Sequence, residues 1–233
     1  HPSHRRTYRS DAMRLTALIS LLLLFAATAC DSSDGTDATL TPPRLDIVTF
    51  EGNTDDGRAR LALVGPDDNG TKLLTASRAL DTATVDPGDR ILAYYTPEEP
   101  DIRLADYAPV NTLKLRVASR EVLDTLSNAP VYVIAVWRTG TWINLRSRLS
   151  YTPEIRTWAL VVDEQTVEGP VARARIVHRL PDGVDPERCY EFNNYTSFDI
   201  SALWKRTGVE ELRIGVDNSN LTSETEFIFR KQQ

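Results

Sequence analysis

Cysteine, methionine and histidine are scarce in this sequence of 233 residues, and their scarcity excludes several kinds of site. The chain holds two cysteines, Cys30 and Cys189, one methionine, and three histidines, of which only His178 lies beyond residue 30. One imidazole and one thiol cannot form a first-row metal site unless carboxylates complete the ligand set. We therefore expect no metal ion and no cofactor.

Recognisable catalytic motifs are also absent. No G-x-S-x-G segment surrounds a candidate serine nucleophile, and the aspartate-rich turns lack the spacing of a calcium-binding loop. Cys189 and His178 form the one thiol–imidazole combination available after residue 30. However, free cysteines are among the most buried residues, and His178 ends an alternating strand pattern. We interpret both as structural, and we expect that the protein is not an enzyme.

An excess of positive charge is lacking as well. The net charge is −6, and residues 1–29 hold four of the 27 Lys and Arg residues and one of the 33 Asp and Glu residues. Residues 30–233 therefore carry 23 basic and 32 acidic residues, a net charge of −9. Such a chain has no general attraction for polyanions, so nucleic acid is excluded as a partner class.

No hydrophobic run reaches the roughly 20 residues that span a hydrocarbon core. Residues 15–29 are fifteen uncharged and mostly apolar residues, which follow Arg14 and precede Cys30. A cation, an apolar run and small residues at the end are typical of a secretory signal peptide. We predict a signal peptide over residues 13–29. We interpret residues 1–12, upstream of Met13, as an extension that results from a start codon assigned too early.

The segment Ala27-Thr28-Ala29-Cys30 resembles a bacterial lipobox. Two interpretations are open: Cys30 is acylated as the first mature residue, or an ordinary secretory cleavage releases a soluble protein. We favour lipidation of Cys30, because a cysteine at this one position is improbable by chance in a chain with only two. Several acyl chains would attach the protein stably to a bilayer. The lipid bilayer is then a partner, and the expected location is the bacterial outer membrane, either facing the periplasm or exposed at the surface.

Residues 30–43 are predicted to be a disordered tether. They contain three aspartates and end in Pro42-Pro43, with almost no apolar surface to bury. The aspartates close behind Cys30 either resemble an export signal to the outer face of the membrane or simply keep a linker soluble. Both readings stay open.

Residues 44–118 are predicted to form a small OB-like barrel. Short apolar runs alternate with Gly, Asp, Asn and Pro, a pattern typical of strands and hairpins. The five expected strands are residues 45–50, 59–64, 72–76, 91–95 and 110–117, and the segment with Pro and Glu before the last strand is expected to be a loop. Five strands in about 75 residues are compatible with an OB-type barrel.

Residues 119–233 are predicted to form an antiparallel β-sandwich, which makes the whole chain all-β. Residues 120–126 fit one or two helical turns at the domain junction, and residues 201–206 fit another. The expected strands are residues 131–137, 142–149, 156–162, 171–177, 198–200, 211–216 and 226–230. Roughly seven strands over about 100 residues suit a sandwich.

The layout resembles the NigD-like lipoproteins. The resemblance is carried by Gly88-Asp89-Arg90-Ile91-Leu92, by the hairpin from Trp137 to Trp142-Ile143-Asn144-Leu145, and by Tyr195-Thr196-Ser197-Phe198-Asp199-Ile200. It implies a lipobox, an N-terminal OB-type domain, a C-terminal β-sandwich and a location in the cell envelope. It implies no established biochemical activity.

These observations favour a membrane-anchored envelope lipoprotein that acts as a non-catalytic binding or interaction module for a protein or a glycan. The candidate binding surface is Trp137, Trp142 and Asn144 at the hairpin. Side chains alternate along a strand, so Trp142 and Asn144 should share one face while Ile143 and Leu145 face the core. The alternative is a secreted or envelope hydrolase that uses two of the many carboxylates.

Overall fold

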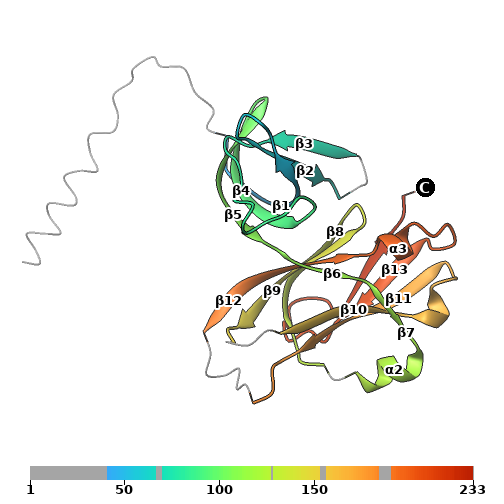
Figure 1. Cartoon of the computed structure of the whole chain (residues 1–233). Helices are drawn as coiled ribbons and strands as arrows, with labels where there is room; N and C mark the ends of the chain where they lie inside the picture. The colour runs from blue at the N-terminus through green and yellow to red at the C-terminus, as the bar shows by residue number, and fades with distance from the viewer. Residues whose placement is uncertain (1–40, 67–69, 127, 153–155, 184–189, 233) are drawn as a thin grey trace, which may run out of the picture. The chain divides into compact units, whose positions relative to one another are not determined.

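The first five strands form one antiparallel sheet in the order β3-β2-β1-β4-β5 (Figure 1). The computed structural model describes residues 41–66, 70–126, 128–152, 156–183 and 190–232. The strands are β1 (Arg44–Asn53), β2 (Ala59–Val64), β3 (Thr71–Thr75), β4 (Arg90–Glu98) and β5 (Asp101–Pro109). Alternate residues such as Val48 and Phe50 are fully buried in a core of their own.

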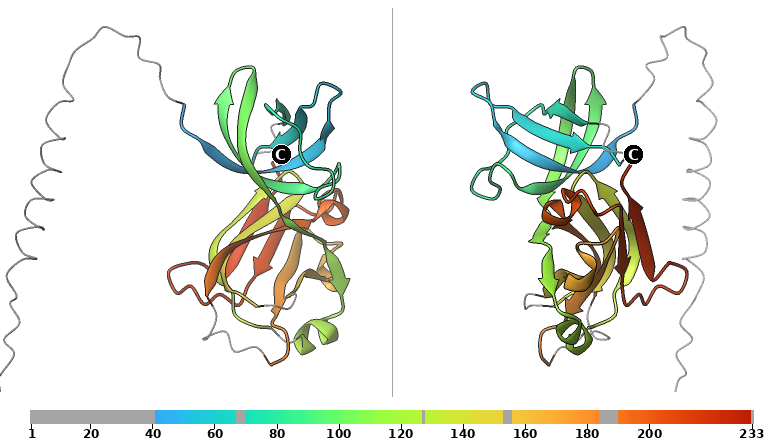
Figure 2. Two further views of the ribbon diagram at one scale, coloured as in Figure 1. Left: turned by 60° about the vertical axis from the view of Figure 1, so that its left-hand side comes forward. Right: turned by 90° about the vertical axis from the view of Figure 1, so that its right-hand side faces the viewer.

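The two edges of this sheet meet. A parallel bridge joins Ala76, just after β3, to Ile102 on β5. The strands therefore follow one another in the closed order β1-β2-β3-β5-β4. Figure 2 shows these strands, coloured blue to green, in two further views. Burial of the alternating residues Ile102 and Leu104 completes the core.

The fifth strand of this sheet differs from the expected one. We expected it at residues 110–117, but it is β5, and its hairpin with β4 turns so tightly that Glu98 pairs with Asp101. The prolines at this turn make the sequence look like a longer loop, because proline is typical of loops. Residues 111–118 instead form β6 (Asn111–Lys114) and β7 (Arg116–Ala118), which pair with strands of the other two sheets. The domain boundary at residues 118/119 stays a prediction.

The remaining strands form a sandwich of two sheets. The four-stranded sheet has the order β6-β12-β9-β8, and the five-stranded sheet has the order β14-β13-β11-β10-β7. Their strands are β8 (Tyr132–Thr139), β9 (Trp142–Ser150), β10 (Thr157–Asp163), β11 (Val171–Arg179), β12 (Glu191–Asp199), β13 (Glu211–Gly215) and β14 (Glu226–Arg230). The sandwich is mixed rather than purely antiparallel as expected, because β6–β12, β7–β10 and β11–β13 are parallel pairs.

One apolar core joins these two sheets. Its largest fully buried members include Ile143, Leu145, Leu160, Ile176 and Phe198 on β9, β10, β11 and β12, together with Ile200 and Leu203 after β12. Both expected helical turns are present, as α2 (Arg120–Thr125) and α3 (Ser201–Trp204), and a short 3-10 turn, η2 (Glu164–Thr166), follows β10. The all-β prediction is confirmed.

Residues 41–233 form one compact unit. The predicted signal peptide, Cys30 and most of the predicted tether lie outside the described residues. Among the helices of the described part of the chain, none has the length and apolar character needed to cross a membrane.

Candidate functional site

The β8–β9 hairpin brings the predicted binding residues onto one face. Trp137 pairs with Asn144 and Thr139 pairs with Trp142 across the antiparallel ladder. Ile143 and Leu145 are fully buried in the sandwich core, so their neighbours project from the opposite face of the sheet. The predicted alternation along β9 is therefore present.

The turn of this hairpin requires its glycine. Gly140 has a φ of 56°, in the left-handed region that favours glycine. A Cβ at this position would lie 3.0 Å from the Cγ1 atom of Val64, on β2 of the first sheet. The tip of the hairpin thus packs closely against the first sheet.

A buried arginine links the first sheet to the hairpin. Arg90, at the start of β4, is 1% exposed, and its Nη2 atom donates to Asn144 Oδ1 at 3.2 Å and to Thr139 Oγ1 at 3.4 Å. Its Nη1 atom donates to Thr49 Oγ1 at 3.2 Å, and its guanidinium carbon lies 5.0 Å from the centre of the Trp142 ring. Burial lowers the pKa of Arg90 to about 10.

Asn144 is completely enclosed by this network. Its Nδ2 atom donates to Thr139 Oγ1 at 2.9 Å, and its Oδ1 atom also accepts from Ser197 Oγ at 2.7 Å. Because its side chain is 0% exposed, Asn144 holds the two sheets together and offers no surface. Trp142 is partly buried against Arg90.

Trp137 lies in a different setting, because it lines a cleft of about 500 Å³ between the first sheet and the outer face of the four-stranded sheet. The apolar lining residues include Leu45, Ile47, Leu63, Leu92 and Ala135. The charged or polar ones include Arg44, Asp46, Thr139, Arg146 and Tyr195. A concave, mostly apolar site with a few polar groups is the usual form of a ligand pocket. Of the three predicted residues, Trp137 is the one that lines this cleft.

Arg146 lines this cleft beside Tyr195 and has, among the described residues, one nitrogen without a hydrogen-bond partner. It pairs with Ala135 on one side and with Tyr195 on the other, and its guanidinium carbon lies 5.7 Å from the Tyr195 ring centre. Its Nε atom is buried and has no hydrogen-bond partner in the described structure. A buried N–H group without an acceptor costs about 1–3 kcal/mol, and Arg90 Nε, in the network between the sheets, is unpaired in the same way.

On the side of the cleft formed by the first sheet, the acidic residue Asp46 of β1 has partners for its carboxylate. Asp46 lies 3.1 Å from Arg44, measured between Oδ2 and Nη2, and it accepts a hydrogen bond of 2.7 Å from the Tyr95 hydroxyl. Burial and the hydrogen bond to Asp46 raise the pKa of Tyr95 well above its usual value. The carboxylate is thus held in place at the rim.

Sequence reasoning missed Arg90, Arg146 and Tyr195. Arg146 belongs to the alternating pattern of β9, on the same face as Trp142 and Asn144, and that spacing was a usable signal. Arg90 gave no such signal, because its burial depends on Asn144, 54 positions further along the chain.

His178 occupies a structural site, as its strand position suggested. Its side chain is 1% exposed, and its ring stacks on Trp158 with centroids 4.3 Å apart. Nδ1 lies 3.4 Å from Ala129 O, and Nε2 lies 2.9 Å from Arg156 Nη1. Burial, followed by the charge of Arg156, lowers the pKa of His178 from 6.5 to about 4. Cys189, which we interpreted as a buried structural residue, lies outside the described residues.

The carboxyl groups with shifted pKa values do not resemble a general acid. Hydrogen bonds lower the pKa of Glu121, and the hydrogen bond from Arg213 lowers that of Glu211. A glycosidase of the predicted alternative type needs an acid with a raised pKa. Within the described ranges, no group of three or more His, Cys, Asp or Glu side chains is placed to hold a metal ion.

Comparison with known proteins identifies the fold. No family model matches the sequence, and no curated protein matches it. Solved structures do match. A protein of unknown function, DUF1344, from Bacteroides vulgatus is 18% identical with a TM-score of 0.64, covering 82% of this chain and 92% of its own.

Two further structures agree with this. A NigD-like immunity protein from Bacteroides caccae is 16% identical with a TM-score of 0.57, covering 81% of this chain and 97% of its own. A candidate lipoprotein from Bacteroides fragilis is 13% identical with a TM-score of 0.55, covering 82% of this chain and 98% of its own. The chain therefore shares the fold of a NigD-like structure, as its sequence resemblance predicted.

Proposed function

We propose that this protein is a NigD-like envelope lipoprotein that binds a glycan in the cleft beside Trp137 and catalyses no reaction. Acylated Cys30 anchors it in the outer membrane, and its closed first sheet is an OB-type domain. The shared fold supports this assignment, since the matching structures include a NigD-like immunity protein and a candidate lipoprotein.

The aromatic lining of the cleft is the observation that carries the binding role, since both Trp137 and Tyr195 line it. Arg146 lines the same cleft, beside the Tyr195 ring. The cleft thus combines aromatic surface with a cationic hydrogen-bond donor.

A sugar ring satisfies both features of this cleft. Its C–H face can stack on an aromatic side chain such as Trp137, while its hydroxyl oxygens accept from Arg146. Its hydroxyl hydrogens can donate to Asp46 at the opposite rim. A glycan is therefore the ligand class whose chemistry fits the lining.

Calorimetric titration with a panel of neutral oligosaccharides tests the proposal. We expect saturable binding by the wild type and an affinity at least tenfold lower for Trp137→Ala, a loss of about 1.4 kcal/mol. Arg146→Gln should lose affinity by a similar factor without lowering the melting temperature, because it removes a buried donor that has no acceptor.

Tyr94→Ala is the matched control, since Tyr94 is an aromatic residue on β4 that is 44% exposed and does not line the cleft. Its affinity should equal that of the wild type. If the wild type binds no oligosaccharide, or if Trp137→Ala binds as tightly as Tyr94→Ala, the glycan assignment is wrong.

A further inference from the structure

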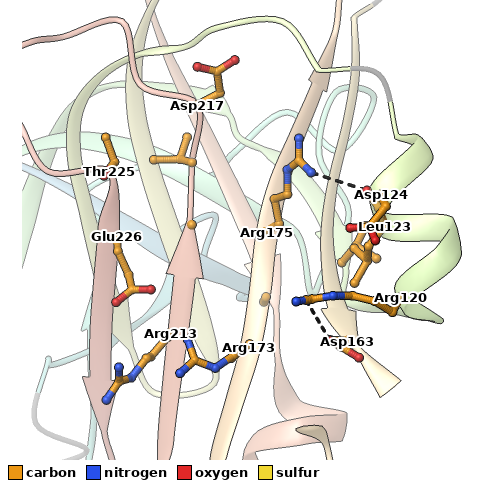
Figure 3. Close-up of a pocket in the computed structure, with 14 residues that line it drawn as sticks. Arg120, Leu123, Asp124, Asp163, Arg173, Arg175, Arg213, Asp217, Thr225 and Glu226 are labelled. Carbon is orange, nitrogen blue, oxygen red and sulfur yellow. Dashed lines mark hydrogen bonds and ion pairs between the residues drawn. The ribbon is translucent and has the colours of Figure 1, made fainter. Parts of the chain in front are cut away.

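A second groove, of about 380 Å³, lies on the outer face of the five-stranded sheet (Figure 3). On this face Leu123 of α2 forms a small cluster with Ala159, Val161 and Val177. The groove runs beside α2, and Glu226 of β14 lines its other side. It is separate from the cleft that contains Trp137.

Three arginines project into this groove from two neighbouring strands. Arg173 and Arg175 are two residues apart on β11, and Arg213 on β13 is the parallel cross-strand partner of Arg173. Figure 3 shows Arg173 and Arg213 next to each other. Like charges in directly opposite positions destabilise a sheet. Arrangements that cost stability are expected at functional sites.

The three arginines differ in how well they are paired. Arg213 Nε donates to Glu211 Oε1 at 2.5 Å, and this hydrogen bond raises the pKa of Arg213. Arg175 Nη1 donates to Leu123 O at 3.4 Å. Among the described residues, the guanidinium of Arg173 has neither an ion pair nor a hydrogen bond, and Arg173 is exposed. Within the described structure, the guanidinium of Arg173 is thus an unpaired cation next to a second arginine, Arg213.

Four carboxyl groups also line the groove and limit what it can bind: Asp124, Asp163, Asp217 and Glu226. Asp163 is paired with Arg120 at 3.2 Å, and the charge of Glu226 helps to raise the pKa of Arg213. Because these carboxylates would repel an extended polyanion, the groove suits a compact anionic group.

Gly215 keeps the groove open. It is the cross-strand partner of Arg175, and a Cβ built on it would have its nearest neighbour, Ala174 O, at 3.9 Å. Its φ is not in the left-handed region, so its backbone does not require glycine. Glycine inside a strand often marks the close approach of a ligand. This observation is independent of the arginine cluster.

We propose that this groove binds an oxyanion, the phosphate or carboxylate group of a small ligand, through Arg173 together with Arg175 and Arg213. The planar guanidinium donates two parallel hydrogen bonds to such a group. The bound charge would also relieve the repulsion between Arg173 and Arg213, and the ligand would occupy the space above Gly215.

Titration calorimetry of the protein with inorganic phosphate and with malonate, at low ionic strength, tests this proposal. We expect saturable binding of at least one anion, and the preferred anion identifies the ligand group as phosphate or carboxylate. Arg173→Gln and Gly215→Val should each lower the affinity at least tenfold. Gly215→Val should do so without lowering the melting temperature, since valine favours a strand.

Arg60→Gln is the control, because Arg60 is an exposed arginine on β2, away from the groove. It should bind the anion as the wild type does. Binding of neither anion by the wild type, or equal affinities for Arg173→Gln and Arg60→Gln, would overturn the proposal. Trp137→Ala should keep its anion affinity, so failure of the glycan site and failure of this site are distinguishable.

Discussion

Three arginines of this fold differ in role because their surroundings differ. Arg90 is buried and donates to neutral oxygens of Thr49, Thr139 and Asn144. Arg146 is half-buried and lines the cleft beside Tyr195, and Arg173 is exposed in the second groove. Burying a cation is costly unless hydrogen bonds replace its water, and the hydrogen bonds of Arg90 connect the first sheet to the hairpin. Arg146 and Arg173 are the arginines for which we propose contacts with ligands.

His178 predicts how stability depends on pH. Its pKa is about 4 in the folded protein, against 6.5 for an unperturbed histidine. Between these values the unfolded chain binds the proton and the folded chain does not. The free energy of unfolding should therefore fall as the pH drops from 6.5 to 4, by roughly 3 kcal/mol at most. Urea titrations across this range measure the slope.

His178→Gln isolates this contribution, because glutamine stays neutral and can still hydrogen-bond. The variant should lose less stability than the wild type between pH 6.5 and pH 4, whatever its stability at neutral pH. Parallel pH profiles for the two proteins would show that protonation of His178 does not contribute.

At the scale of elements, the β8–β9 hairpin serves two sheets at once. Its inner face supplies Ile143 and Leu145 to the sandwich core, and its outer face carries Asn144 and Trp142 to Arg90 of the first sheet. One hairpin thus connects two hydrophobic cores. A substitution on the inner face should therefore disturb the sandwich core, and a substitution on the outer face should disturb the contacts with Arg90.

Truncation of the two faces should have unequal costs. Leu145→Ala removes a side chain that is 0% exposed and should lower the free energy of unfolding by about 2–5 kcal/mol. Trp142→Ala should cost less, because Trp142 is partly exposed and leaves the sandwich core intact. Thermal melts compare the two. A larger loss for Trp142→Ala than for Leu145→Ala would contradict this prediction, because it would mean that the Trp142 ring contributes more to stability than the Leu145 side chain does.

At the scale of the whole molecule, we expect the predicted membrane anchor to be independent of the folded unit. Among the described residues, both large cores consist of Val48 and later residues, and residues 30–43 are predicted to be a tether with almost no apolar surface to bury. Cys30→Ala should move the protein from the membrane fraction to the soluble fraction and leave its melting temperature unchanged. Intact mass of the native protein provides the direct test: a mature N-terminus at Cys30 without acyl mass would contradict lipidation.

Strand positions and fold class were predictable because they follow from local patterns. Alternation along residues 142–149, turn residues between apolar runs and the short helical segment at residues 120–126 each reflect neighbours a few positions apart. The misplaced fifth strand shows where this reasoning fails. Pro97 and Pro100 are typical of a loop, yet the chain continues through them as a hairpin because Ile102 and Leu104 fill the first core.

The sequence by itself determined the all-β class, most strand positions and the alternation that puts Trp142 and Asn144 opposite Leu145. The tertiary structure alone decided which of these residues stay accessible. Asn144 is enclosed because Arg90, 54 positions earlier, reaches it from another sheet. Likewise, Arg173 meets Arg213 because two strands 40 positions apart pair in parallel. The pairing of distant strands depends on burial of the whole core, which no short stretch of sequence encodes.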